Sequence, residues 1–362
     1  MAENNLPLTG LSFDAIRLNL RNYIAAKPEF TDYDFNDSAI GSLLDLLAYN
    51  TYYNAFYANM AANEGFLDTA QLYENVVSRA KALGYVPSSA RSAQANLKII
   101  FTTAVANTTF RTIRIPKNTT FTSAVNGITY FFVTPQTYTV AANSTNGFAD
   151  YITLKEGTPL THTFAFNRTS NTEFILPNDN VDTSSITVQV TTSGNTQTYI
   201  PADDITTINS SSQIFFIDAD KARKYKVVFG DGVLGNQPET GASVEISYRV
   251  CSGSIVNGTN NFTSVNATIG GQLSYVLLPI GRAENGANPE QIESVRFNAP
   301  RLYETQNRTV TLNDYERIAK RENPDIEAVS IWGGEDNEPP QYGKAYVCIK
   351  PKNADYLDDI QK

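Results

Sequence analysis

The sequence predicts a multidomain α+β protein, with an N-terminal helical bundle module, a central mostly antiparallel β-domain and a small C-terminal α+β domain. Three observations lead to this prediction. Apolar residues recur at helical spacing at first, alternate with polar residues beyond Arg91, and combine both patterns from Asn288 onward. A chain of 362 residues also exceeds the usual size of one domain. We therefore place the domains at 1–90, 91–285 and 286–362.

The N-terminal module is expected to contain three helices. Pro28 ends the first, whose apolar residues follow a three-four-three step: Phe13, Ile16, Leu20 and Tyr23. The second begins after Asp37 or Ser38, because either side chain can accept a hydrogen bond from a free backbone N–H group, and it continues to about Ala62. The third ends at Gly84, which suits a left-handed C-terminal cap, and carries Leu72, Val76, Ala80 and Leu83.

The central region alternates apolar and polar residues, a pattern typical of half-buried strands. The alternation is clearest at Ala95, Leu97, Ile99 and Phe101, at Ile113 and Ile115, and at Val188 and Val190. Runs of Thr, Asn, Ser and Gly at 141–147 and 191–198 favour turns between the strands. Short strands separated by regular turns predict a β-sandwich or barrel.

The C-terminal region combines helix and strand signals. A helix is expected from Asn288 to about Leu302, because Pro289 suits the first helical position and Glu290 the first turn. The segment 311–314 resembles a capping box with Asp in place of Glu, and predicts a short helix through Arg321. Two strands are expected next, at 328–332 and 344–350. Residues 355–362 resemble the start of another helix, so we expect either an abrupt end or further polypeptide.

Composition excludes several classes of function. Charged residues make up 18% of the chain and the net charge is −9, so no basic surface for a phosphate backbone is expected, and nucleic acid is excluded as a partner. The sequence contains neither a signal segment nor a bilayer-spanning stretch, so we expect a soluble protein with no membrane partner. Cys251 and Cys348 lack the spacing of a disulfide framework or zinc site and are expected to be buried thiols.

No group of residues predicts catalysis, a cofactor or a metal. Gly230–Gly235 fits GxGxxG, but Pro238 and Gly241 follow where a dinucleotide site needs a helix, so a glycine-rich hairpin is expected. His162 is the only histidine, and without a nucleophile motif it is expected on a strand surface. Four carboxylates lack EF-hand spacing and are expected in solvated turns: Asp203, Asp204, Asp218 and Asp220.

The second predicted helix carries the positive signal for function. A helix with apolar side chains on more than one side must be buried, and two neighbouring helices give it little cover. It could pack within the chain against the β-domain, or it could complete a bundle with other chains. The helix has two apolar stripes, the second including Leu43. We predict that it binds partners through Leu46, Tyr49, Tyr53, Phe56, Met60, Ile40, Leu44 and Leu47.

Several segments of the sequence are familiar when taken together. FTDYDF at 30–35, LLDLLAYNTYYNAFY at 43–57, NEGFLD at 63–68 and VSRAKALGY at 77–85 resemble the start of the baseplate wedge subunit of T-even-type contractile-tailed bacteriophages. The segments 229–248 and 288–315 resemble the baseplate J-like family, and WGGE at 332–335 and PPQYG at 339–343 are also similar. The segment 120–215 carries no familiar motif, and we interpret it as a candidate lineage-specific insertion.

The resemblance implies a structural, non-enzymatic role in the tail baseplate of the virion, assembled in the host cytoplasm. It implies a second copy of the chain in each wedge, and a helical bundle between the N-terminal helices and another wedge subunit. The other domains would form a ring around the central hub and relay the trigger for contraction, with the hub and the sheath-initiating subunit as further partners. Relatives continue past the position of Lys362, so ring closure is expected to need further sequence.

Two alternative functions stay open. One is a tail enzyme that degrades polysaccharide with carboxylates drawn from the four aspartates named above. The other is a glycan-binding β-module in the Thr- and Asn-rich middle region.

Overall fold

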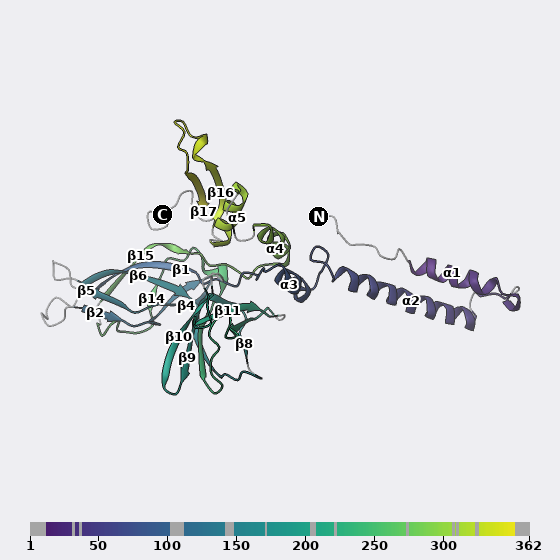
Figure 1. Ribbon diagram of the computed structural model, residues 1–362, viewed down its shortest axis with the longest axis horizontal. Coiled ribbons are helices and arrows are strands. Elements are labelled where there is room, and N and C mark those ends of the chain that lie inside the picture. Colours follow the sequence, from purple (N-terminus) through teal and green to yellow (C-terminus); the bar gives the residue numbers. More distant parts are fainter. Residues whose placement is uncertain are drawn as a thin grey trace. The chain divides into compact units, whose positions relative to one another are not determined.

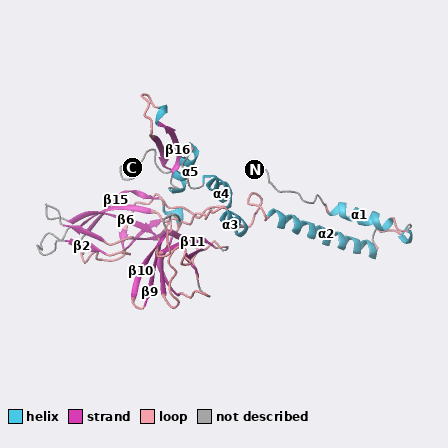
Figure 2. Cartoon of the chain, viewed as in Figure 1, coloured by secondary structure: helices cyan, strands magenta, loops and turns pink. Residues whose placement is uncertain are grey.

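The computed structural model describes residues 12–30, 33–35, 38–101, 112–141, 148–170, 172–202, 208–220, 223–272, 275–305, 308, 311–322 and 326–351. It confirms the α+β class, with helices first, strands in the central region, and a small α+β region last (Figure 2). The chain divides into two compact units, one comprising 1–84 with 292–299 and the other comprising 85–291 with 300–362. The predicted boundaries at residues 90 and 285 remain predictions.

The N-terminal region contains the three predicted α-helices, and the second begins at one of its two predicted caps. The elements are α1 (Phe13–Ala25), the short 3-10 helix η1 (Pro28–Phe30), α2 (Ala39–Asn63) and α3 (Tyr73–Ala82). Ser38 caps α2, because its Oγ accepts a hydrogen bond from the backbone N–H of Gly41 at 3.0 Å. Asp37, the other predicted cap, lies outside the described residues. Gly84 follows α3 with a φ of 76°, as the left-handed cap requires.

Helix α1 packs antiparallel to the first half of α2. Arg17 of α1 forms an ion pair with Asp45 of α2, with Nη2 and Oδ2 2.9 Å apart. Four residues earlier on α1, the ring of Phe13 meets the ring of Tyr49 edge-on at 5.7 Å. Tyr23, predicted on the apolar face of α1, is 66% exposed.

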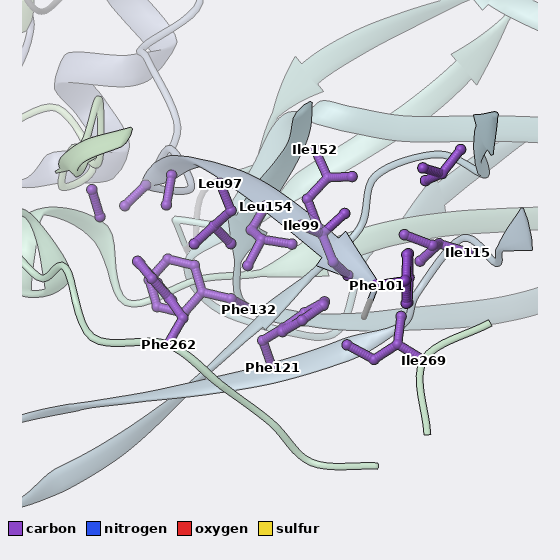
Figure 3. Close-up of a cluster of buried hydrophobic side chains, with 14 of the residues drawn as sticks. Leu97, Ile99, Phe101, Ile115, Phe121, Phe132, Ile152, Leu154, Phe262 and Ile269 are labelled. Atoms are coloured by element: carbon purple, nitrogen blue, oxygen red, sulfur yellow. The ribbon is translucent and has the colours of Figure 1, made fainter. Parts of the chain in front are cut away.

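One sheet has six antiparallel strands in the order β14-β3-β4-β6-β1-β15. The predicted alternation puts Leu97, Ile99 and Phe101 of β1 into its core, where they meet Phe121 and Phe132 (Figure 3). A ribbon of β2 and β5 contributes to the same core. The bounds are β14 Thr263–Ser264, β3 Thr120–Val125, β4 Ile128–Val133, β6 Phe148–Glu156, β1 Gln94–Phe101, β15 Tyr275–Glu284, β2 Thr112–Ile115 and β5 Tyr138–Ala141.

The second sheet has seven strands in the order β7-β13-β9-β10-β11-β12-β8, antiparallel except between β10 and β11. Val188 and Val190 of β9 are buried, as predicted. The segment 120–215 supplies strands to both sheets. The bounds are β7 Thr158–Ala165, β13 Ser243–Val250, β9 Val181–Thr192, β10 Asn195–Pro201, β11 Ile214–Ala219, β12 Tyr225–Phe229 and β8 Glu173–Ile175.

Two predicted turns differ from the observed connections. The turn expected over 191–198 is confined to Ser193 and Gly194, both with positive φ, because the flanking residues extend β9 and β10. The glycine-rich hairpin at 230–235 was a wrong prediction. Strand β12 pairs with β11 and β8, whereas β13 pairs with β7 and β9, so the glycine-rich loop connects strands that are not neighbours.

The C-terminal region contains α4 (Ile292–Thr305), α5 (Leu312–Glu322), β16 (Ile326–Gly333) and β17 (Ala345–Pro351), and α5 contacts β16 (Figure 1). The predicted capping box is confirmed: the backbone N–H of Thr311 donates to Asp314 Oδ2 at 2.8 Å, and the Asp314 N–H donates to Thr311 Oγ1 at 3.3 Å. The predicted helix start at Pro289 is wrong. Glu290 precedes the helix and accepts hydrogen bonds from the Tyr85 hydroxyl and the Ser88 backbone.

Candidate functional site

The exposed surface of α2 is the candidate functional site. Nine of its large hydrophobic side chains are 37–66% exposed: Leu43, Leu46, Leu47, Tyr49, Tyr52, Tyr53, Phe56, Tyr57 and Met60. Large apolar side chains normally avoid water, and a continuous exposed group of them marks an interaction surface. We call these nine side chains the α2 surface.

Six of the eight side chains predicted to bind partners belong to this surface, namely Leu46, Leu47, Tyr49, Tyr53, Phe56 and Met60. Ile40 is half-buried. Leu44 is only 2% exposed, because the helical rotation puts it on the same face as Gly41 and Ala48, which are also buried. Leu44 therefore stabilises the chain itself and does not form part of the α2 surface.

An aromatic ladder runs along one side of the α2 surface. The ring of Tyr49 lies 4.9 Å from the ring of Tyr53, which lies 6.2 Å from that of Tyr57. Phe13 of α1 extends the ladder beyond Tyr49. Tyr52 and Tyr57 were missing from the predicted binding residues. The four-residue spacing of Tyr49, Tyr53 and Tyr57 could have found Tyr57, since side chains four apart share a helix face.

Only part of α2 is covered by α1 among the described residues. At a rise of about 1.5 Å per residue, the 13 residues of α1 span roughly 20 Å and the 25 residues of α2 roughly 37 Å. The fully buried residues of α2 are Gly41, Leu44 and Ala48, all in its first half. From Tyr49 to Asn63 every side chain is exposed or half-buried. The second half of α2 therefore offers apolar side chains that the described residues of its own unit leave in contact with solvent.

The α2 surface is electrically neutral. Asp45 is the one charged residue of the helix, and its charge is balanced by Arg17. The Tyr53 hydroxyl donates to the Tyr49 hydroxyl at 3.4 Å, and this hydrogen bond raises the pKa of Tyr53 above its usual value. The Tyr53 hydroxyl therefore stays neutral near pH 7. Such a surface suits another apolar helix and does not suit a phosphate or a metal ion.

The residues considered for other chemistry occupy structural positions wherever the structure describes them. His162 lies in β7 and stacks on Tyr248, with ring centroids 5.8 Å apart. Asp218 forms an ion pair with Lys226 at 3.4 Å. Asp203 and Asp204 lie outside the described residues. In the glycine-rich loop, Asp231 Oδ1 accepts hydrogen bonds from the backbone N–H groups of Val233 and Leu234, each at 2.9 Å, and no helix begins there.

Three further features bear on function. Among the described residues, no group of three or more His, Cys, Asp and Glu side chains is placed to hold a metal ion. No helix in the described part of the chain is both long and apolar enough to cross a membrane. Cys251 is buried, as predicted, but Cys348 is exposed. That second prediction was wrong because β17 belongs to a sheet of only two strands, which leaves much of its surface open.

Two parts of the chain match models of phage baseplate domains. Residues 12–85 match the baseplate wedge protein gp6-like helical domain, and residues 311–362 match C-terminal domain I of the baseplate structural protein gp6. The first match contains the whole α2 surface. The class that these matches indicate is the structural wedge protein of a bacteriophage tail baseplate.

Nearly the whole chain is similar to baseplate wedge protein gp6 of Enterobacteria phage T4, with 27% identity over 383 residues. The match covers 98% of this chain and 56% of the relative, so the chain spans just over half the length of the curated relative. A chain in the solved cryo-EM structure of the anti-feeding prophage baseplate also matches, with 9% sequence identity and a TM-score of 0.34. That match covers 89% of this chain and 59% of the other. The sequence matches support a structural subunit located in the virion's tail baseplate. The resemblance to baseplate J-like proteins remains a prediction.

Proposed function

We propose that the chain is a baseplate wedge subunit that assembles with other chains through the α2 surface. The observation that carries this proposal is the exposure of nine large hydrophobic side chains on one helix with no unpaired charge. The partners we propose are a second copy of the chain and another wedge subunit, whose helices would complete a bundle around α2. Leu44 and Ala48 would stay in contact with α1, while the α2 surface packs against the added helices.

The size of the surface indicates how many helices it needs. Full burial of a large apolar side chain contributes about 1.5–3 kcal/mol, and these side chains are already roughly half buried, so each would contribute about 1 kcal/mol more. The nine side chains of the α2 surface would then contribute roughly 9 kcal/mol, and a single stripe about half of that. Association itself costs on the order of 4–15 kcal/mol. One stripe alone would be marginal, which favours a bundle that covers both stripes of α2.

We also propose a wider role for the remaining domains, in a ring around the central hub that relays the trigger for sheath contraction. The hub and the sheath-initiating subunit would be additional partners. The support is the similarity to the T4 wedge protein along nearly the whole chain. The ring proposal rests on that similarity, whereas the bundle proposal also rests on the exposure of α2.

The test is co-expression of the full chain with a candidate wedge partner, followed by measurement of the mass of the complex by light scattering. Tyr53→Glu and Phe56→Glu place charges on the α2 surface, and we expect each to reduce the mass to that of the separate chains. The substitutions should leave the single chain folded, because both positions are 41–52% exposed, and circular dichroism checks this.

Thr198→Glu is the matched control. Thr198 is an exposed residue of β10, so the substitution adds the same charge at a place outside the helical unit. We expect its complex to keep the mass of the unmodified one. An unchanged mass in both α2 variants would exclude the bundle role.

A further inference from the structure

Five polar side chains are buried together where residues of the two large sheets meet. Ser92, Glu156, Asp182, Arg249 and Cys251 are each at least nine-tenths buried. Glu156 ends β6, and Ser92 precedes β1, so both accompany the six-stranded sheet. Asp182 lies in β9, Arg249 in β13, and Cys251 directly after β13, so these accompany the seven-stranded sheet. We call this group the buried cluster.

Arg249 connects the two sides of the buried cluster. Its Nη1 lies 3.8 Å from Asp182 Oδ2 and donates to Ser92 Oγ at 3.4 Å. Asp182 Oδ2 in turn accepts a hydrogen bond from the Ser92 backbone at 3.1 Å. Glu156 accepts hydrogen bonds from the Ser252 backbone at 3.0 and 3.2 Å. Each carboxylate therefore accepts a hydrogen bond from a residue that flanks a strand of the other sheet, Ser92 before β1 and Ser252 after β13.

The chain passes from one sheet to the other beside Arg249. A single residue, Gly157, separates the end of β6 from the start of β7, and its φ is 115°. A Cβ atom at this position would lie 2.8 Å from Arg249 Cγ and would collide with the carbonyl oxygen of Val250. Glycine is required here both for the backbone angle and for the close approach of the arginine stem.

The buried cluster holds two carboxylates and one guanidinium group. Burial raises the pKa of Glu156 above its usual value and lowers that of Arg249. The remaining titratable member is Cys251, and burial raises the pKa of its thiol to about 11, so it stays neutral near pH 7. With both carboxylates ionised, the cluster carries one uncompensated negative charge. Buried charge without a partner strongly destabilises a structure.

We propose that Arg249, Asp182 and Glu156 form an ionic latch that couples the two sheets, and that release of this latch lets them separate locally. The latch is neutral when Glu156 is protonated and carries surplus charge when Glu156 is ionised. Because the pKa of Glu156 is raised in the folded chain, protonation favours the closed latch at low pH. This contribution is lost as the pH rises through the folded pKa. The proposal concerns the β-rich region and does not depend on the α2 surface.

Cys251 provides the reporter for the test. The full chain carrying Cys348→Ser, which removes the exposed thiol, is treated with a thiol reagent near neutral pH, and the rate of Cys251 modification measures opening at the cluster. We expect Arg249→Met to raise this rate by about tenfold or more. Loss of the arginine charge disfavours the reactive thiolate, so faster modification can only come from opening. Hydrogen exchange at Leu97 and Ile99 of β1 should accelerate less, because the six-stranded core stays folded.

Lys226→Met is the matched control. Lys226 is a largely buried cation that also pairs with two carboxylates, Glu173 and Asp218, but all three lie in the seven-stranded sheet. The quantity compared is the rate of Cys251 modification divided by the rate of hydrogen exchange in β1. We expect Lys226→Met to leave this ratio as it is in the parent chain. If Arg249→Met and Lys226→Met change that ratio equally, the latch proposal is overturned.

Glu156→Gln keeps the test informative if Arg249→Met does not fold. The glutamine retains an acceptor for Ser252 and removes the surplus charge. Above the folded pKa of Glu156, we expect slower Cys251 modification than in the parent chain, and a weaker dependence on pH after correction for the thiolate fraction. A rate and pH profile identical to the parent would overturn the proposal.

Discussion

Glu64 supplies a cap that α3 lacks in its own sequence. Leu72, which stands at the N-cap of α3, has no side chain able to accept a hydrogen bond. The carboxylate of Glu64, just past the end of α2, accepts from the backbone N–H groups of Gln71 at 2.8 Å and Leu72 at 3.2 Å. It also accepts from Asn75 Nδ2 at 2.7 Å. One side chain therefore fixes the end of α2 to the beginning of α3.

The substitution Glu64→Gln tests this role. Glutamine keeps the length of the side chain but offers one acceptor oxygen and no charge. A hydrogen bond to a charged group contributes about 1.5–3 kcal/mol, and one between neutral groups about 0.5–1.5 kcal/mol. Since the site is only half-buried, we take the lower ends of these ranges and expect a loss of about 1 kcal/mol in the free energy of unfolding at neutral pH.

The effect of Glu64→Gln should depend on pH in a defined direction. Partial burial opposes ionisation of Glu64, but the hydrogen bonds from Asn75, Gln71 and Leu72 outweigh it and lower the pKa of the carboxyl. The stabilisation is therefore complete above the ordinary glutamate pKa and is lost as the pH falls through the lower folded value. The difference between the two chains should disappear in acid.

Urea unfolding followed by circular dichroism, at neutral pH and at a pH below the folded pKa, measures both expectations. Glu74→Gln is the control, because Glu74 is an exposed carboxylate in the first turn of the same helix. Removing its charge should cost only the interaction with the helix dipole, about 0.3–1 kcal/mol. Equal losses in the two variants, with equal pH profiles, would refute the capping role of Glu64.

Two further substitutions test other local arguments. Gly235→Ala should lower the free energy of unfolding, measured by urea denaturation, by about 1–3 kcal/mol, because the added Cβ would lie 2.7 Å from Ile214 Cγ1 and the φ of 90° disfavours alanine. Gly241→Ala is the control: its φ is also positive, but the space around it is open, so it should cost less. Thr311→Ala removes the Oγ1 atom that accepts a hydrogen bond from the Asp314 N–H, and it should cost about 1 kcal/mol. Relative to the unmodified chain, hydrogen exchange should accelerate more in α5 than in α4, and an equal change in both helices would contradict this.

Helix starts governed by neighbouring residues were predictable from the sequence. Ser38 and the Thr311–Asp314 pair satisfy backbone N–H groups within three positions, so the pattern alone identifies them. Pro289 satisfied the same local rule, but the helix does not begin there. Glu290, its neighbour, bonds to Tyr85 and Ser88 from the other end of the β-rich region, and this distant contact holds the segment outside the helix. Local rules cannot include such a contact.

Strand pairing was beyond prediction for a similar reason. Alternation identified the buried side of β1 correctly, because one strand is enough to show which side chains are apolar. It could not show that β1 lies between β6 and β15, which are far apart in the sequence. The glycine-rich loop was misjudged as a hairpin because its positive φ angles fit either a tight turn or a longer connection. Pairing partners decide between the two, and they are not local.

The α2 surface depends both on local spacing, which the sequence shows, and on a distant contact, which it does not. Its two apolar stripes were predictable from spacing, but which residues α1 covers depended on how α1 docks, and this removed Leu44 from the surface. The side chains that remain exposed include no charge, and the one charge of the helix is already paired with Arg17. Charge therefore cannot select a partner for this surface. In the bundle we propose, selection would come from how well a second helix fits between the aromatic ladder and the stripe formed by Leu43 and Leu47, since apolar packing discriminates by shape.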